Sequence, residues 1–201
     1  MMMTKQLRIA VADDEPDTRE FFERYLPRLG HQVAAVAENG PELVERCRQS
    51  KPDLIITDLR MPGLDGLAAV EAVFRETAVP VIVVTAYADE AWVERAQQAG
   101  VFAYLLKPIT EQELKPAIAL AWRQFEQFQA LRQEASDLRQ SLEDRKVIER
   151  AKGVVVRRVG VPEAEAFRRL RKFASDHNQK LVEVAQRVLA AEEVFHAMDQ
   201  A

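Results

Sequence analysis

Short apolar runs alternate with amphipathic stretches over residues 7–107. The first, third and fourth runs are nearly continuous and rich in β-branched residues, as strands buried on both faces of a parallel sheet are. Between the runs, apolar residues return at the spacing of an amphipathic helix. This alternation predicts an α/β fold, a doubly wound five-stranded parallel sheet. The predicted strands are 7–11, 33–36, 54–57, 81–84 and 102–106, and the predicted helices are 17–29, 41–50, 66–76 and 90–99.

The pattern changes to a single long helix after residue 111. Glycine is absent between Gly100 and Gly153, and Pro116 is the single proline in the interval 109–161, so we expect one helix over about 111–158. Its apolar residues form an imperfect heptad seam, which favours a coiled-coil dimer; a helix packing back on its own chain is the alternative. The seam residues are Leu114, Ala117, Ala121, Phe128, Leu131, Ala135, Leu138 and Leu142.

Two shorter helical patterns complete the chain. Gly160 and Pro162 mark the end of the long helix and the start of the next one. Apolar faces then recur over 166–174 and 181–189, separated by a turn at 176–178. The C-terminal part is therefore predicted to be a small three-helix unit.

The charge is distributed unevenly along the chain. The whole chain has a net charge of −4, but residues 1–120 carry 13 Lys+Arg and 19 Asp+Glu, a net of −6. Residues 145–190 carry 12 Lys+Arg and 5 Asp+Glu, a net of +7. The basic end is compatible with a polyanionic partner, and equally with an ordinary solvated helical surface.

Other features of the composition indicate a cytoplasmic protein. No apolar run approaches the roughly 20 residues that a membrane span needs, and the first eight residues lack the apolar core of a secretory signal. Cys47 is the single cysteine, which excludes an intrachain disulfide and suits a reducing compartment.

Polar residues follow four of the five predicted strands. Asp13 and Asp14 follow the first strand, Asp58 the third, Thr85 the fourth and Lys107 the fifth. In a parallel sheet these side chains converge at one edge. Three neighbouring carboxylates repel one another, and a divalent cation with oxygen ligands, such as Mg²⁺, resolves that repulsion. An aspartate after a strand is common in loops, but five polar residues at matched strand ends indicate a site.

The same residues resemble the signatures of the response-regulator receiver family, which has a flavodoxin-like fold. The matching motifs are Val11-Ala12-Asp13-Asp14-Glu15, Asp58 to Gly66, Val84-Thr85-Ala86 and Leu106-Lys107-Pro108. The resemblance covers about residues 5–120 and implies that Asp58 accepts a phosphoryl group from a sensor histidine kinase. The implied Mg²⁺ ligands are Asp13, Asp14, Asp58 and the backbone carbonyl of Arg60.

The resemblance also implies how phosphorylation is sensed. Thr85 and Lys107 would contact the phosphoryl group, and the Lys107–Pro108 peptide would be cis. Thr85 moving inward would leave space for the ring of Tyr104, the family's aromatic switch; simple strand packing is the alternative for that ring. Arg60 and Tyr87 occupy positions that tune the lifetime of the acyl phosphate, in a direction that the sequence leaves open.

The basic end resembles the ANTAR domain, the RNA-binding module of transcription antitermination regulators. The matching motifs are Arg145 to Gly153, Glu165 to Arg171, Ala174-Ser175-Asp176 and Val184-Ala185, so the resemblance covers about residues 143–195. The sequence departs from the family pattern at Leu181-Val182-Glu183, where a polar residue is expected at the middle position. It implies binding to paired hairpins in leader transcripts, generally as a dimer. The candidate RNA contacts are Arg145, Lys146, Arg150, Lys152, Arg157, Arg158, Arg168 and Lys172.

Together these observations predict a response regulator with a receiver over 1–120, a coiled-coil linker over 121–142 and an RNA-binding output domain over 143–201. A DNA-binding regulator is one alternative, since three short basic helices can imitate a helix-turn-helix. A phosphorelay module whose basic end docks a protein is another. An enzyme is not expected, because the sequence shows no nucleophile–base pair, Gly-rich nucleotide loop or His/Cys metal cluster.

Overall fold

The computed structural model describes residues 5–86 and 100–199. The chain divides into two compact units, Met1–Gln129 and Ala130–Ala201, which we describe separately. No helix in the described part of the chain has a stretch long and apolar enough to cross a lipid bilayer. The predicted helix at 90–99 lies outside the described residues.

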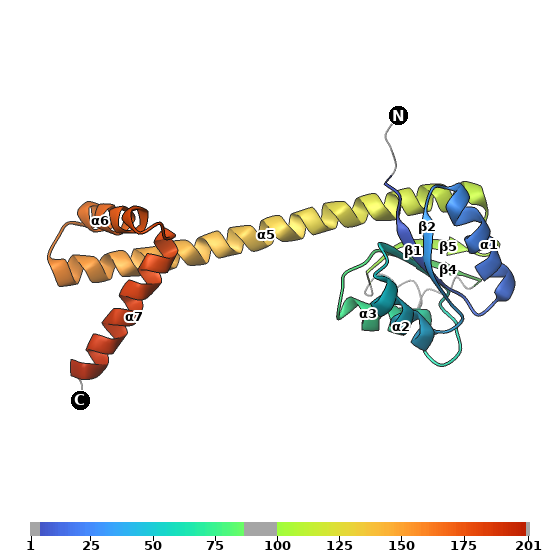
Figure 1. Cartoon of the computed structure of the whole chain (residues 1–201), viewed down its shortest axis with the longest axis horizontal. Coiled ribbons are helices and arrows are strands. Elements are labelled where there is room, and N and C mark those ends of the chain that lie inside the picture. Colours follow the sequence, from blue (N-terminus) through green and yellow to red (C-terminus); the bar gives the residue numbers. More distant parts are fainter. Residues whose placement is uncertain (1–4, 87–99, 200–201) are drawn as a thin grey trace. The chain divides into compact units, whose positions relative to one another are not determined.

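The first unit contains the predicted five-stranded parallel sheet (Figure 1). The strand order is β2-β1-β3-β4-β5, so the chain reverses its winding direction beside β1 and β3. Parallel sheets place ligand sites at such a switch point, at the carboxyl ends of the strands. The strands are β1 (Arg8–Ala12), β2 (Gln32–Ala37), β3 (Leu54–Thr57), β4 (Val81–Thr85) and β5 (Val101–Leu106).

Helices cover both faces of this sheet. On one face α2 (Gly40–Ser50) and α3 (Gly66–Phe74) pack against alternate strand residues such as Ala10 and Ile55. The opposite face is covered by α1 (Pro16–Arg28) and the first turns of α5 (Glu111–Val159). Because successive strand residues point to opposite faces, nearly continuous apolar strands supply both cores.

The first part of the predicted heptad seam on α5 is wrong. Leu114, Ala117 and Ala121 are buried in the core of the first unit, so they are not available to a partner helix. The exposed seam begins at Phe128 and continues through Leu142. A three-to-four-residue spacing marks an apolar helix face but does not show what covers it, and here the sheet covers the first third.

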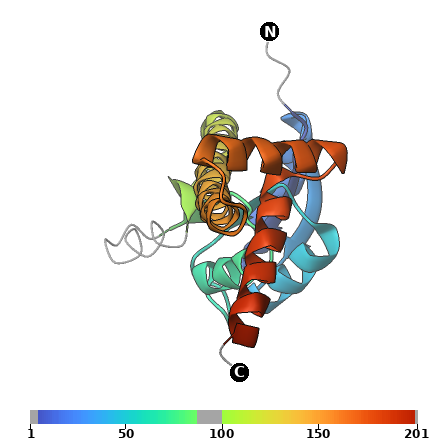
Figure 2. The same ribbon diagram turned by 90° about the vertical axis from the view of Figure 1, so that its left-hand side faces the viewer.

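The second unit is formed by the end of α5 together with α6 (Glu163–Asp176) and α7 (Leu181–Asp199) (Figure 2). Gly160 adopts a φ of +71°, a left-handed conformation suited to glycine, directly after α5 ends. The predicted three-helix unit is confirmed. Its small core consists of Ala151, Leu170, Ala174, Val184 and Ala185.

A buried histidine makes the stability of the first unit depend on pH. His31 is 8% exposed, and its Nδ1 accepts a hydrogen bond from the backbone N–H of Leu7 at 3.3 Å. Burial lowers the pKa of His31 below its usual value of 6.5. When the pH falls below 6.5, His31 binds a proton in the unfolded chain more readily than in the folded protein. The free energy of unfolding therefore decreases as the pH falls from above 6.5 toward the lower pKa of the folded state.

We therefore expect His31→Gln to lose less unfolding free energy than the wild type between about pH 7.5 and pH 5.5. Chemical denaturation at each pH measures the difference, and the exposed His196→Gln is the matched control. A wild type and a His31→Gln variant with equal pH dependence would contradict the assignment.

Candidate functional site

Three carboxylates converge at the carboxyl end of the sheet. Asp13 and Asp14 follow β1 and Asp58 follows β3, and these strands are parallel neighbours with Ala12 opposite Thr57. Oxygen atoms of the three carboxylates lie within 4.8 Å of one another. Asp13 and Asp58 are buried, whereas Asp14 is exposed. The predicted acidic residues are thus brought together by the strand order.

Lys107 places an ammonium group among these carboxylates. Its Nζ lies 2.9 Å from Oδ2 of Asp58, 2.9 Å from Oδ2 of Asp13 and 2.7 Å from Oε2 of Glu15. Burial alone would lower the pKa of Lys107, but hydrogen bonds to the three carboxylates outweigh it and raise the pKa above its ordinary value. The lysine therefore stays charged. The Lys107–Pro108 peptide bond is cis, as the receiver resemblance implies.

The charges of the pocket fit a divalent cation. Lys107 contacts three carboxylates, those of Asp13, Glu15 and Asp58, and the Asp14 carboxylate lies close to the other two aspartates. Burial raises the pKa of Asp13 to about 6, because a buried carboxylate loses hydration. Its Oδ2 is close to Lys107 but accepts no hydrogen bond in suitable geometry. This buried oxygen without a hydrogen bond lies beside the carboxylates of Asp14 and Asp58. Carboxylate oxygens are the ligands that Mg²⁺ prefers, so the three aspartates fit a magnesium site.

The loop after Asp58 is held in place by backbone contacts. Oδ1 of Asp58 accepts hydrogen bonds from the N–H groups of Leu59 and Arg60. The N–H of Gly66, the first residue of α3, donates to the carbonyl of Leu59 at 2.9 Å. A Cβ at position 66 would lie 1.9 Å from the carbonyl oxygen of Asp58, so only glycine lets the helix approach this closely. The loop leaves Oδ2 of Asp58 directed toward Lys107.

Two residues that stabilise the pocket were missed by the sequence analysis. Nη1 of Arg19 donates to the backbone carbonyls of Asp13 and Asp14, at 2.7 and 2.9 Å, and so holds the acidic turn. Glu15 receives a hydrogen bond from Lys107, which lowers the pKa of its carboxyl. Glu15 stands in the matched acidic motif, but a position on a turn does not show which way a side chain points.

Two further predicted residues, Thr85 and Tyr104, lie on the neighbouring strands β4 and β5. Thr85 is fully buried at the end of β4, and its carbonyl accepts the N–H of Lys107 at 2.9 Å. Tyr104 lies on β5 opposite Val83 and packs against the core on the α2 and α3 side. The side chain of Arg60 is exposed. Tyr87 lies outside the described residues. The switch roles of Thr85 and Tyr104, and the Arg60 carbonyl as a ligand, stay predictions.

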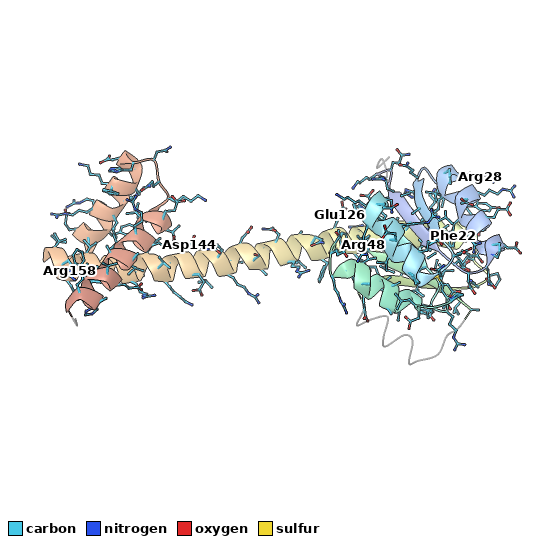
Figure 3. All side chains as sticks on the ribbon, turned by 60° about the horizontal axis from the view of Figure 1, so that its bottom comes forward. Phe22, Arg28, Arg48, Glu126, Asp144 and Arg158 are labelled. Atoms are coloured by element: carbon cyan, nitrogen blue, oxygen red, sulfur yellow. The ribbon has the colours of Figure 1, made fainter. Side chains whose placement is uncertain are left out.

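The basic residues of the second unit are largely paired with carboxylates. Nε of Arg158 lies 2.7 Å from Oε2 of Glu192, and Arg157 approaches the same carboxylate at 3.9 Å; Arg158 is labelled in Figure 3. The other paired candidates are Lys146 with Glu143, Lys152 with Glu149 and Glu163, and Arg168 with Glu165. Among the described residues, no carboxylate forms an ion pair with Arg145, Arg150 or Lys172. These three cations are thus free to meet an anion without first breaking a pair.

Comparison with known proteins agrees with both halves of this description. The family profile "Response regulator receiver domain" matches residues 9–119, and the profile "ANTAR domain" matches residues 128–189. The "Transcriptional regulatory protein PdtaR" of Mycobacterium tuberculosis is 37% identical over 182 residues, which is 90% of this chain and 89% of that protein. The fold and the acidic pocket define a signal receiver domain. The chain belongs to the family of response regulators that join a receiver to an ANTAR antitermination output domain, which are transcriptional regulators and not enzymes.

Solved structures match the receiver part. The receiver domain of the response regulator NarL from Mycobacterium tuberculosis is 30% identical, with a TM-score of 0.56 over 60% of this chain and 98% of that one. The receiver domain of AraT from Geobacillus stearothermophilus is also 30% identical, with a TM-score of 0.56 over 62% and 99%. Both support the receiver fold of the first unit.

Proposed function

We propose that this chain is a phosphorylation-controlled regulator that accepts a phosphoryl group on Asp58 and binds RNA hairpins to promote transcription antitermination. The observation that carries the proposal is the buried Asp58 carboxylate 2.9 Å from the Lys107 ammonium, in a chain that also contains an ANTAR domain. A protein that acts on nascent transcripts works in the cytoplasm, which is the location we propose. Domain limits at residues 120 and 142 stay predictions.

The proposed phosphodonor is a phosphohistidine of a sensor kinase. An Asp58 carboxylate oxygen forms the new O–P bond while the P–N bond of the phosphohistidine breaks, and the leaving imidazole nitrogen keeps the electron pair. Lys107 holds a positive charge beside the transferred oxygens. Asp13, Asp14 and Asp58 would hold Mg²⁺, which when bound neutralises further charge on the transferring phosphoryl group.

The product changes the charge of the pocket. A phosphoryl group adds about −1.5 to −2 charge and three strong acceptor oxygens. We propose that the Thr85 hydroxyl donates to one of these oxygens, and that the ring of Tyr104 then takes up the space that Thr85 leaves. Because the N–H of Lys107 is bonded to the carbonyl of Thr85, a shift of the end of β4 is passed to the end of β5.

We expect the wild type to gain one phosphoryl group by mass after incubation with a small phosphodonor and Mg²⁺, and Asp58→Asn to gain none. Asp17→Asn, an exposed aspartate on α1, is the matched control and should label like the wild type. An unchanged mass for the wild type, or equal labelling of Asp58→Asn, would refute the assignment of the phosphoacceptor.

The apolar seam of α5 is the proposed dimer interface. Phe128, Leu131, Leu138 and Leu142 are 51%, 66%, 57% and 56% exposed. Side chains project into solvent from about Glu126 to Asp144 (Figure 3). Large apolar residues repeated at heptad spacing on an exposed helix are typical of a coiled coil, and we propose that a second copy of α5 covers them.

Charge placed in this seam should dissociate the dimer. Leu131→Lys with Leu138→Lys buries two ammonium groups in the interface, so we expect at least about a tenfold weaker dimer, equal to 1.4 kcal/mol. Gln133→Lys with Gln140→Lys adds the same charge at the same spacing outside the seam and is the control. Sedimentation of the phosphorylated chain measures both, and a wild type that stays monomeric would overturn the interface.

RNA affinity should depend on the unpaired cations more than on the paired ones. Each phosphate contact changes the slope of log affinity against log salt by about −0.7 for single strands. Replacing Arg145, Arg150 and Lys172 with Gln should therefore make the slope shallower by up to about 2 units. Replacing the paired Lys146, Arg157 and Arg168 with Gln is the charge-matched control and should change the slope less.

Fluorescence anisotropy with a two-hairpin RNA across a salt series measures these slopes, with a DNA duplex of equal length for comparison. Tighter binding to the duplex would favour the DNA-binding alternative. Binding to neither nucleic acid would favour a protein-docking output.

A further inference from the structure

An apolar groove lies on the second unit where α5, α6 and α7 meet. Its volume is about 440 Å³, within the range of sites that hold a small organic group. Val159, Leu170, Val188 and Ala191 form part of its apolar lining. The groove lies entirely within the second unit, which also carries the residues proposed to bind RNA.

One wall of the groove is an aromatic side chain held in place by a second ring. Phe173 lines the groove and is 43% exposed. Its ring stacks on the ring of His177, with centroids 4.0 Å apart and planes inclined by 20°. Nδ1 of His177 also lies 2.9 Å from the carbonyl oxygen of Phe173. The exposed ring is therefore positioned before any ligand arrives, which reduces the entropy lost on binding.

The rim of the groove carries one unpaired cation. Arg169 and Arg187 are its charged lining residues, and Nε of Arg169 pairs with Oε1 of Glu165 at 2.8 Å. No carboxylate lines the groove among the described residues. Arg187 donates to the side chain of Gln179 at 3.0 Å and forms no ion pair with a described carboxylate. Two neighbouring grooves of this unit are different, because carboxylates line them, including Asp144 in one and Glu192 in the other.

We propose that this groove takes an unpaired base from the loop of an RNA hairpin. The base stacks on Phe173 over the apolar floor, and Arg187 contacts a flanking phosphate. Stacking on aromatic rings is a common way to read unpaired bases, and a cation beside the ring suits a nucleotide. An apolar helix of a protein partner would fill the floor but leave Arg187 without an anion. The inference rests on the proposed RNA-binding function and deepens it.

The test compares a two-hairpin RNA with the same RNA made abasic in its loops, using the phosphorylated full chain and fluorescence anisotropy. Base stacking of this kind should give the wild type about a tenfold preference for the RNA with loop bases. Ala191→Phe places a ring in the groove from an exposed position on α7. We expect this variant to bind the intact and the abasic RNA equally, with the affinity that the wild type has for the abasic RNA. Ala190→Phe is the same change one residue away, outside the groove, and should keep the preference.

A second variant leaves the groove open. Arg187→Gln should weaken binding and make the salt slope shallower by about 0.7, whereas Arg132→Gln, an exposed cation on α5, should not. If Ala191→Phe keeps the wild-type preference, or if the wild type binds both RNAs equally, the groove assignment is wrong while RNA binding stands. If the wild type binds neither RNA, the proposed RNA-binding function fails and this inference fails with it.

Discussion

The receiver depends on keeping two buried carboxylates beside each other. Asp13 and Asp58 follow neighbouring strands, and each buried carboxylate gives up hydration that other charges must replace. Lys107 supplies the first compensating charge at 2.9 Å from each, and the remaining negative charge suits a divalent cation. Burial raises the pKa of Asp13 to about 6 even with this lysine beside it. A pocket balanced in this way is sensitive to any new charge, which is the property that a phosphorylation switch needs.

The surrounding fold supports this arrangement of charges. The strand order brings three strand ends to one edge, and Gly66 lets α3 approach the loop that positions Asp58. Arg19 holds the acidic turn by donating hydrogen bonds to the backbone carbonyls of Asp13 and Asp14. The hydrogen bond from the N–H of Lys107 to the carbonyl of Thr85 joins the ends of β4 and β5. We propose that a change of charge at Asp58 is passed along this connection to β5, the strand that precedes α5.

Much of this could be predicted from the sequence, because strand and helix periodicities are local and the polar residues follow the strands directly. The described strands and helices lie where the pattern placed them, within a few residues, except that α7 continues to Asp199, ten residues beyond the predicted apolar face. What covers a helix face is not local information, so Leu114, Ala117 and Ala121 were wrongly assigned to the dimer seam instead of the receiver core. Ion pairs are also not visible in the sequence, because they depend on residues far apart in the chain. The cations can be counted from the sequence, but the pairing of Glu192 with Arg157 and Arg158 is seen only in the structure.

We propose that charge at Asp58 controls the affinity of the output unit for RNA. The most direct measurement is the affinity of the full chain for one two-hairpin RNA before and after treatment with a small phosphodonor and Mg²⁺, in parallel with Asp58→Asn. Coupling of the usual size predicts about a tenfold increase for the wild type and no change for Asp58→Asn. Equal affinity of the phosphorylated and unphosphorylated wild type, with phosphorylation verified by mass, would contradict the account.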